Sequence, residues 1–193
     1  MSTLSGTPAA STPVADTPSA DILARAATLR LIAFDVDGVF TDGRIYYGAD
    51  GEMLKAFNTL DGHGIKQLAR AGIEVAIITG RRSGIVATRA AELGIRRVHQ
   101  GVRDKAQAMT ALLADTGVPL AAVAYMGDDW PDLAVLCRVG LAFAPANAHP
   151  DVLARAHHVT AARGGEGAVR EACDLILRAR GDYDALLAAA CGG

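Results

Sequence analysis

Two acidic residues with a short spacing follow an apolar run early in the chain. The stretch LIAFDVDGVFTDG, residues 31–43, places Asp35 and Asp37 directly after four apolar residues that read as a buried strand. Carboxylates at the exit of a buried strand are unfavourable unless a cation or a reaction requires them. A helix cap needs only one such side chain, so capping explains the pair poorly. The pair is therefore a candidate for metal binding or catalysis.

Further polar side chains follow other predicted elements. They are Thr79, Gly80 and Arg81 after a second apolar run, Lys105 at the start of a helix, and Asp128, Asp129 and Asp132 after a third apolar run. Oxygen ligands without His or Cys select a hard cation, above all Mg²⁺. A Lys, an Arg and a Thr hydroxyl beside that ion would complete a phosphate-binding site. One Asp could then attack phosphorus while a second acts as general acid and base.

The elements that would position these residues alternate between strand and helix. Apolar, β-branched runs predict strands over 30–36, 73–80, 96–101, 123–129, 139–145 and 157–160, and helical patterns fill 64–71, 83–93, 104–116 and 169–181. Such alternation predicts an α/β fold with a doubly wound, Rossmann-type parallel sheet covered by helices on both faces. Ligands bind at the carboxyl ends of the strands in such sheets. We therefore expect the polar residues to converge on one edge.

One segment departs from this alternation. Residues 43–57, GRIYYGADGEMLKAF, contain two short strand-like runs around Asp50 and Gly51, which predicts a β-hairpin flap in place of a cap domain. Residues 1–27 include a Ser-, Thr-, Ala- and Pro-rich stretch and are predicted to be a disordered tail. We assign 28–187 to one domain and 188–193 to a C-terminal tail.

Composition narrows the class of protein. The 193 residues are 51% hydrophobic with a formal net charge of −2, which gives no indication of a nucleic-acid or membrane surface. No apolar run approaches the roughly 18 residues of a membrane span, and we expect no signal peptide. Three cysteines without a CxxC pair indicate reduced thiols, as in the cytoplasm. The five histidines lack the spacing of metal ligands, so none is assigned to a metal.

The motifs together resemble the haloacid dehalogenase (HAD) superfamily of phosphohydrolases. The resemblance rests on DVDGVFTDG, ITGR, Lys105 and GDDWPD. It implies that Asp35 is the nucleophile, that Asp37 is the general acid and base, and that Thr79 and Lys105 bind the phosphoryl group. It further implies that Asp35, the main-chain carbonyl of Asp37 and Asp128 hold Mg²⁺, with Asp129 and Asp132 supporting that site.

Residues 29–187 resemble more closely one capless HAD family, the 3-deoxy-D-manno-octulosonate 8-phosphate phosphatases. The stretches that carry this resemblance are FDVDGVFTDGRIYY, FNTLDGHGIK, IITGRRS, AELGI, QGVRDK, GDDWPDLAVL and RGGEGAVREACDLIL. The resemblance implies a role in lipopolysaccharide biosynthesis and a homotetramer in which neighbouring subunits close each pocket. It also places Gly80, Arg81 and Arg89 near an anionic sugar-acid substrate and residues 163–167 near the site.

Two positions depart from this family pattern and leave alternatives open. Leu60 stands where several members have Arg, and Glu166 stands where a basic residue is frequent. Both segments lie near the expected sugar or tail contacts, so a phosphatase of a related nine-carbon ulosonate 9-phosphate is an alternative. A catalytically inactive regulatory relative is a second. A response-regulator receiver is a third, although that fold does not carry both aspartates of a DxD motif on one strand.

Overall fold

A six-stranded parallel sheet forms the centre of the computed structural model, which describes residues 18–192. The strands lie in the order β5-β4-β1-β6-β7-β8, so β1 is central and the chain winds outward in both directions from it. The strands are β1 Leu31–Phe34, β4 Glu74–Thr79, β5 Arg97–Gln100, β6 Val123–Met126, β7 Leu141–Ala144 and β8 His158–Val159. The predicted doubly wound parallel sheet is confirmed.

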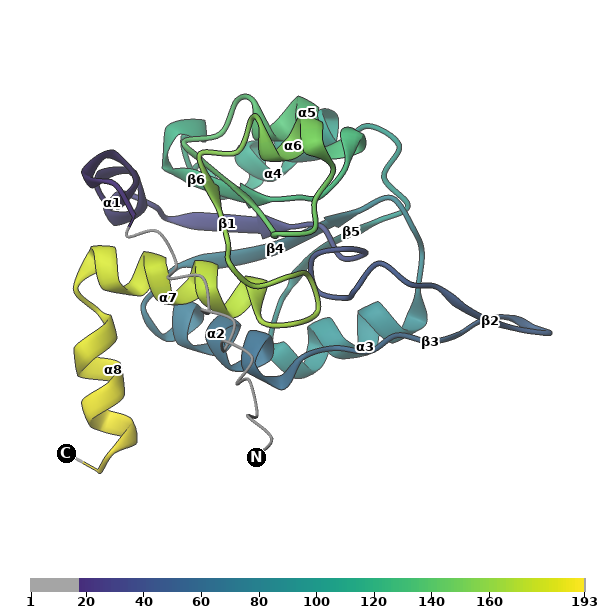
Figure 1. The fold of residues 1–193 in the computed structure, drawn as a ribbon, viewed down its shortest axis with the longest axis horizontal. Coiled ribbons are helices and arrows are strands. Elements are labelled where there is room, and N and C mark those ends of the chain that lie inside the picture. The colour runs from purple at the N-terminus through teal and green to yellow at the C-terminus, as the bar shows by residue number, and fades with distance from the viewer. Residues whose placement is uncertain (1–17, 193) are drawn as a thin grey trace, which may run out of the picture.

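Helices cover both faces of this sheet (Figure 1). On one face lie α1 Ala20–Ala27, α2 Thr59–Arg70, α3 Gly84–Leu93 and α7 Ala168–Arg180, and on the other lie α4 Lys105–Thr116, α5 Trp130–Leu136 and α6 Pro150–Leu153. The short 3-10 helix η1 Leu120–Ala122 precedes β6, and α8 Tyr183–Ala190 extends away from the body. Between residues 18 and 192, no helix combines the length and the apolar character that crossing a membrane requires.

Side-chain alternation along β1 builds two separate cores. Ile32 and Phe34 face the α1, α2, α3 and α7 side, whereas Leu31 and Ala33 face the α4 and α5 side. All four are fully buried, because a strand covered on both faces must be apolar at every position. Each large apolar side chain buried in this way contributes about 1.5–3 kcal/mol. The uninterrupted apolar run that precedes Asp35 is thus the sequence signature of a central strand.

Capping residues account for the ends of several helices. Ser83 caps α3, and Asp104 caps α4 by accepting a hydrogen bond from Gln107 N at 3.0 Å. The glycines after both helices adopt left-handed backbone conformations, as expected for helix C-termini. Helix α2 is longer than predicted and begins at Thr59, because Asn58 provides an N-cap ahead of the glycine-containing segment.

Helix α7 receives its N-terminal cap from another helix. Its own N-cap residue, Gly167, has no side chain with which to accept a hydrogen bond. Asp61 of α2 accepts a hydrogen bond from Arg170 N at 2.8 Å instead, in the first turn of α7. Asp61 is therefore a cap between helices.

Both predicted tails require correction within the described residues. Helix α1 occupies part of the predicted disordered tail, because Ile22 and Ala26 pack into the core and Ser19 caps the helix. Residues 1–17 of that predicted tail lie outside the described residues. At the other end, α8 continues to Ala190 and so includes part of the predicted C-terminal tail.

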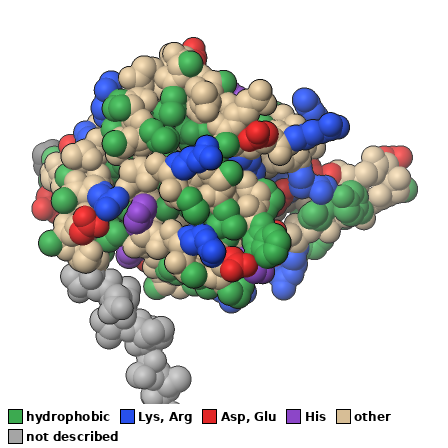
Figure 2. Space-filling model, turned by 90° about the horizontal axis from the view of Figure 1, so that it is seen from above, with side chains coloured by type: hydrophobic (Ala, Val, Ile, Leu, Met, Phe, Trp, Pro, Cys, Tyr) green, Lys and Arg blue, Asp and Glu red, His purple; other side chains and the backbone are tan. Residues whose placement is uncertain are grey.

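The predicted hairpin consists of β2 Tyr46–Gly48 and β3 Gly51–Leu54, and it projects from the carboxyl edge of the sheet (Figure 1). In the space-filling view it extends from the body on the right, with hydrophobic side chains gathered along it (Figure 2). Half of the exposed large hydrophobic residues described in the chain belong to this segment: Ile45, Tyr46, Tyr47, Met53 and Leu54. No large cap domain is present in the described residues.

Candidate active site

A buried lysine joins two carboxylates at the carboxyl edge of the sheet. Lys105 Nζ lies 2.8 Å from Asp35 Oδ2 and 2.7 Å from Asp132 Oδ1. Asp35 follows β1, Lys105 is the first residue of α4, and Asp132 lies in the first turn of α5. All three residues are buried. Burial lowers the pKa of Lys105, but the charges of Asp35 and Asp132 outweigh it and raise the pKa, so the ammonium stays protonated.

Asp132 organises this part of the site by accepting hydrogen bonds from three further atoms. One oxygen accepts a hydrogen bond from Tyr125 Oη at 2.5 Å, and the other accepts from the backbone N–H groups of Asp128 and Asp129 at 3.1 and 3.2 Å. Asp129 is exposed and accepts from Trp130 N at 2.8 Å as the N-cap of α5. The two aspartates predicted to support the metal site thus differ, because Asp132 contacts Lys105 directly and Asp129 points to the helix start.

Strand register brings Asp128 beside Asp35. Phe34 of β1 pairs with Met126 of β6, so Asp35, one residue after β1, and Asp128, two residues after β6, emerge at the same edge of the sheet. One carboxylate oxygen from each of Asp35, Asp128 and Asp132 lies within 4.8 Å of the others. Gly38 leaves the room for this, because a Cβ at its position, with φ +90°, would lie 2.0 Å from Asp128 Oδ2.

The cluster of three carboxylates fits a hard divalent cation. Burial, then the charge of Asp132, raises the pKa of Asp35 to about 6, and burial, then Asp132 and Asp35, raises that of Asp128 to about 8. Asp35 Oδ1 is buried without a hydrogen-bond partner among the described residues. A cation among these oxygens would satisfy that atom and relieve the repulsion. All the donors are oxygen atoms, which is the ligand set that Mg²⁺ prefers. We call Asp35, Lys105, Tyr125, Asp128 and Asp132 the sheet-edge cluster.

The side chain of Asp37 belongs to a second set of contacts that comes from the hairpin. Lys55 Nζ contacts Asp37 Oδ1 and lies 3.0 Å from Glu52 Oε1, and Arg81 Nε lies 3.7 Å from Asp37 Oδ2. Glu52 also accepts a hydrogen bond from Ser83 Oγ. We call Asp37, Glu52, Lys55, Arg81 and Ser83 the hairpin cluster.

Lys55 and Glu52 shift the pKa values of one another in opposite directions. Burial lowers the pKa of Lys55, but Asp37 and Glu52 outweigh it and raise the pKa. Burial raises the pKa of Glu52, but Ser83 and Lys55 outweigh it and lower the pKa. Both groups therefore stay charged near neutral pH. Sequence analysis missed Lys55 and Glu52, and no motif marks them, because their burial depends on how the hairpin folds back over Asp37.

Three of the predicted substrate-binding residues lie at the carboxyl end of β4, at the same edge of the sheet. Thr79 ends β4 and is buried, level with the residue between Asp35 and Asp37 because Phe34 pairs with Ile77. Gly80 and Arg81 follow at the same edge, and Arg81 Nη2 donates to Tyr47 Oη at 2.7 Å.

Arg89 lies apart from both clusters. Its guanidinium is 3.1 Å from Glu92 Oε2 and lies over the Phe57 ring, with Cζ 6.0 Å from the ring centroid. Its side chain also borders Gly62 of α2. No hydrogen bond or ion pair joins Arg89 to either cluster in the part of the chain that the structure describes.

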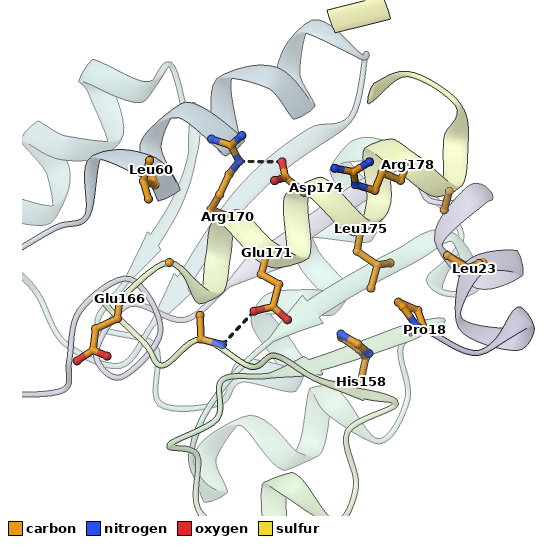
Figure 3. A pocket seen from close by; sticks show the side chains of 13 residues that line it. Pro18, Leu23, Leu60, His158, Glu166, Arg170, Glu171, Asp174, Leu175 and Arg178 are labelled. Carbon is orange, nitrogen blue, oxygen red and sulfur yellow. Dashed lines mark hydrogen bonds and ion pairs between the residues drawn. The ribbon is translucent and has the colours of Figure 1, made fainter. Parts of the chain in front are cut away.

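A cavity of about 910 Å³ lies along α7 rather than at the sheet edge. Figure 3 shows Leu60 and Glu166, the two residues that depart from the family pattern, toward one end, and Pro18 and Leu23 toward the other. None of the sheet-edge or hairpin residues lines it. The convergent charged groups with shifted pKa values lie instead at the sheet edge, so we locate the chemistry there.

The glycine-rich segment 163–167 packs against the loop that follows Asp37. Gly165 N donates to Val39 O at 3.0 Å, and Gly164 N donates to Asn147 Oδ1 at 2.7 Å. A Cβ at Gly164 would lie 1.8 Å from Gly38 O, so only glycine allows this approach. The segment therefore borders the site of its own chain.

Comparison with known proteins agrees with the geometry. A family model described as haloacid dehalogenase-like hydrolase matches residues 94–171. The 3-deoxy-D-manno-octulosonate 8-phosphate phosphatase KdsC of Yersinia pestis is 52% identical over 159 residues, which cover 82% of this chain and 85% of that protein. KdsC of Escherichia coli K12 is 50% identical over 163 residues, covering 84% and 87% of the two chains.

A solved structure shows the same architecture. The Moraxella catarrhalis 3-deoxy-D-manno-octulosonate 8-phosphate phosphatase, in complex with a magnesium ion, a phosphate ion and a KDO molecule, aligns with a TM-score of 0.86 at 42% identity. The alignment covers 88% of this chain and 97% of that one. The fold and the acidic edge thus define a capless HAD-like hydrolase. Within that class, the chain belongs to the KdsC family. This membership excludes the response-regulator alternative.

Proposed function

We propose that this protein is a Mg²⁺-dependent phosphatase that hydrolyses 3-deoxy-D-manno-octulosonate (KDO) 8-phosphate to KDO and phosphate in lipopolysaccharide biosynthesis. The observation that carries the proposal is the convergence of Asp35, Asp128 and Asp132 with Lys105 in a chain that is half identical to KdsC proteins. The Moraxella relative, which was solved with magnesium, phosphate and KDO, supports both the cofactor and the substrate.

Binding of the substrate phosphate is assigned to the sheet edge. In this proposal Asp35, the main-chain carbonyl of Asp37 and Asp128 would hold Mg²⁺, which would supply positive charge to offset that of the phosphoryl oxygens. Lys105 and the Thr79 hydroxyl bind the same phosphoryl group. Asp132, held by Tyr125, fixes the Lys105 ammonium, and Asp129 supports the turn that carries Asp128.

The reaction then proceeds in two displacements. Asp35 attacks phosphorus, the bond from phosphorus to the sugar oxygen breaks, and Asp37 gives a proton to the departing oxygen. This leaves an aspartyl-phosphate on Asp35. Water next attacks that phosphorus while Asp37 accepts its proton, and phosphate leaves as the Asp35 carboxylate is restored.

Recognition of the sugar acid is assigned to Gly80, Arg81 and Arg89. Arg81 lies beside Asp37, and Arg89 faces the start of α2, so both guanidinium groups can attract an anionic substrate. Leu60 and Glu166 favour a second candidate, a phosphatase of a nine-carbon ulosonate 9-phosphate. Both residues line the cavity along α7, and neither belongs to the groups assigned to phosphate binding. The intact Asp35, Asp37, Lys105 and Asp128 argue against a catalytically inactive relative.

We further propose a cytoplasmic homotetramer in which hairpins of neighbouring subunits pack together. The exposed apolar side chains of the hairpin support this arrangement, because a soluble chain rarely gathers so many on one projection. The three cysteines, all free in the structure, agree with a reducing compartment. Light scattering after size exclusion would measure the mass, and a monomeric mass would contradict the assembly.

A panel of phosphorylated sugar acids tests the activity. Phosphate release from KDO 8-phosphate should exceed release from the nine-carbon 9-phosphates, and EDTA should abolish it until Mg²⁺ is restored. Faster release from a nine-carbon substrate would establish the second candidate instead. No release from any member of the panel, with Mg²⁺ present, would contradict the enzymatic assignment.

A further inference from the structure

Lys55 is buried although it belongs to the most exposed part of the molecule. Lys55 is 9% exposed, whereas Tyr47 and Met53 of the same hairpin are 62% and 61% exposed. Removing an ammonium group from water is unfavourable unless carboxylates surround it. Asp37 and Glu52 are those carboxylates. The buried position of Lys55 is therefore determined by charged partners and not by apolar packing.

The partners of Lys55 fix it from two directions. Glu52 accepts from Ser83 Oγ, and Ser83 is also the N-cap of α3, with its backbone N–H donating to Gln100 Oε1 at 2.7 Å. The hairpin is thus tied through Glu52 to the start of α3. Because α3 packs on the central sheet, this tie holds Lys55 in a constant position relative to the strands.

The carboxylate of Asp37 takes its direction from this cluster. One of its oxygens contacts Lys55, and the other lies 3.7 Å from Arg81 Nε, a distance too long for a direct hydrogen bond. Among the described residues, no hydrogen bond or ion pair joins the Asp37 side chain to the sheet-edge cluster. Lys55 is therefore the closest group that orients Asp37.

We propose that Lys55 is a positioning residue for proton transfer, which holds the Asp37 carboxyl group toward the sugar oxygen of the substrate. This inference rests on the proposed function. In the first displacement Asp37 gives its proton to the departing sugar oxygen, and in the second it takes one from the attacking water. Both transfers require the carboxyl group within hydrogen-bond distance, and a side chain free to rotate would meet that condition only part of the time.

Two substrates with different leaving groups separate positioning from structural damage. An alkoxide such as the sugar oxygen must be protonated as it leaves, whereas p-nitrophenolate is stable without a proton. Replacing Lys55 by Met removes the ammonium and keeps the length of the side chain. We expect Lys55→Met to lower kcat for KDO 8-phosphate by roughly 100-fold and kcat for p-nitrophenyl phosphate by about threefold at most, with KM nearly unchanged.

Matched variants complete the experiment. Lys55→Arg keeps the charge and should restore most of kcat for the sugar phosphate. The chain has three lysines, and Lys66 on α2 is exposed, so Lys66→Met is the same chemical change away from the site. Glu52→Gln leaves Lys55 in place and loosens its anchor, so it should show the same substrate contrast at about tenfold. It also keeps the inference testable if Lys55→Met unfolds.

The outcomes distinguish this inference from the proposed function. Equal losses on both substrates in Lys55→Met and Glu52→Gln, or unchanged kcat in both variants, would overturn the positioning role while the wild type remains an active phosphatase. A wild type that releases phosphate from neither substrate would overturn the proposed function and this inference with it. A selective loss on the sugar phosphate, reversed in Lys55→Arg, would establish the role.

Discussion

The sheet-edge cluster and the hairpin cluster each place a buried lysine between two carboxylates. Lys105 lies between Asp35 and Asp132, and Lys55 lies between Asp37 and Glu52. They differ in charge balance. Three carboxylates face one ammonium at the sheet edge, whereas two carboxylates face Lys55 and Arg81 in the hairpin cluster. The first cluster needs a further cation, whereas the second already contains two cationic side chains.

The two clusters also differ in what carries them. The sheet-edge residues lie at the ends of β1 and β6 and at the starts of α4 and α5, which are all fixed by the central sheet. In the hairpin cluster, Glu52 and Lys55 depend on a short two-stranded projection whose outer surface is exposed. A two-stranded hairpin has little stability of its own. We therefore expect phosphate chemistry to depend on the sheet edge, and proton transfer to depend on the hairpin.

Loss of the nucleophile should have the largest effect. Asp35→Asn removes the attacking oxygen but keeps the shape of the side chain, so kcat should fall on the order of 10⁴-fold or more on every substrate. Circular dichroism should show an unchanged fold. Residual activity above one-tenth of the wild type would show that Asp35 is not the nucleophile.

Lys105 should matter next, and without the substrate contrast expected of Lys55. Lys105→Met removes the ammonium that binds the phosphoryl group, so kcat should fall about 10²- to 10³-fold for both KDO 8-phosphate and p-nitrophenyl phosphate. Steady-state kinetics on both substrates, with Lys66→Met as the control, would measure it. A loss confined to the sugar phosphate would remove the proposed distinction between the clusters.

Arg89 tests how far the substrate region extends beyond both clusters. Arg89→Ala should lower kcat/KM for KDO 8-phosphate by roughly tenfold, because a guanidinium that attracts the sugar carboxylate is lost, and should leave p-nitrophenyl phosphate nearly unchanged. Arg96→Ala, at an exposed position after α3, is the control. Equal slowing of both substrates would contradict a role in the sugar pocket.

Asp61 lies outside both clusters and should affect stability with little effect on chemistry. Burial raises its pKa to about 6. The hydrogen bond from the Arg170 backbone N–H and the positive charges of Arg170 and Arg89 act in the opposite direction and lower that pKa. The folded state therefore binds more protons than the unfolded state between about pH 4 and pH 6, so this group makes stability fall as pH rises through that window. Above it, the ionised side chain costs on the order of 2–3 kcal/mol.

Replacing Asp61 by Asn keeps the cap on α7 and removes the charge. The melting temperature of Asp61→Asn should exceed that of the wild type by several degrees at pH 7.5, and the difference should shrink toward pH 4. Thermal unfolding at a series of pH values would measure it. A constant difference across the series would show that Asp61 does not titrate in this way.

Much of the sheet edge could be predicted from the sequence. Asp35, Asp128 and Thr79 each follow an apolar run. The carboxyl ends of parallel strands meet at one edge of the sheet, whatever conformation the connecting loops adopt. Lys105 was predicted because Asp104 marks the start of its helix. The different tasks of Asp129 and Asp132 were not separable, because both positions fit a helix cap and only the packing of Tyr125 and Lys105 distinguishes them.

Errors arose where local composition was overridden by packing. The Ala- and Ser-containing segment before Arg25 was predicted to be disordered, yet α1 forms because Ile22 and Ala26 are buried against the sheet side of α7. The hairpin itself was predicted from Asp50 and Gly51, but the inward position of Lys55 was not. A lysine after a short exposed strand looks like surface charge in the sequence.

By itself the sequence determined that strands alternate with helices along the chain. It also determined which oxygen and cationic groups follow the strands, since both features depend on local apolar runs and the residues that end them. Only the tertiary structure decided which carboxylate each lysine would join. That choice depends on the balance between the cost of burying an ammonium and the attraction of carboxylates from distant segments, and this balance exists only once the hairpin, α3 and the sheet are packed together.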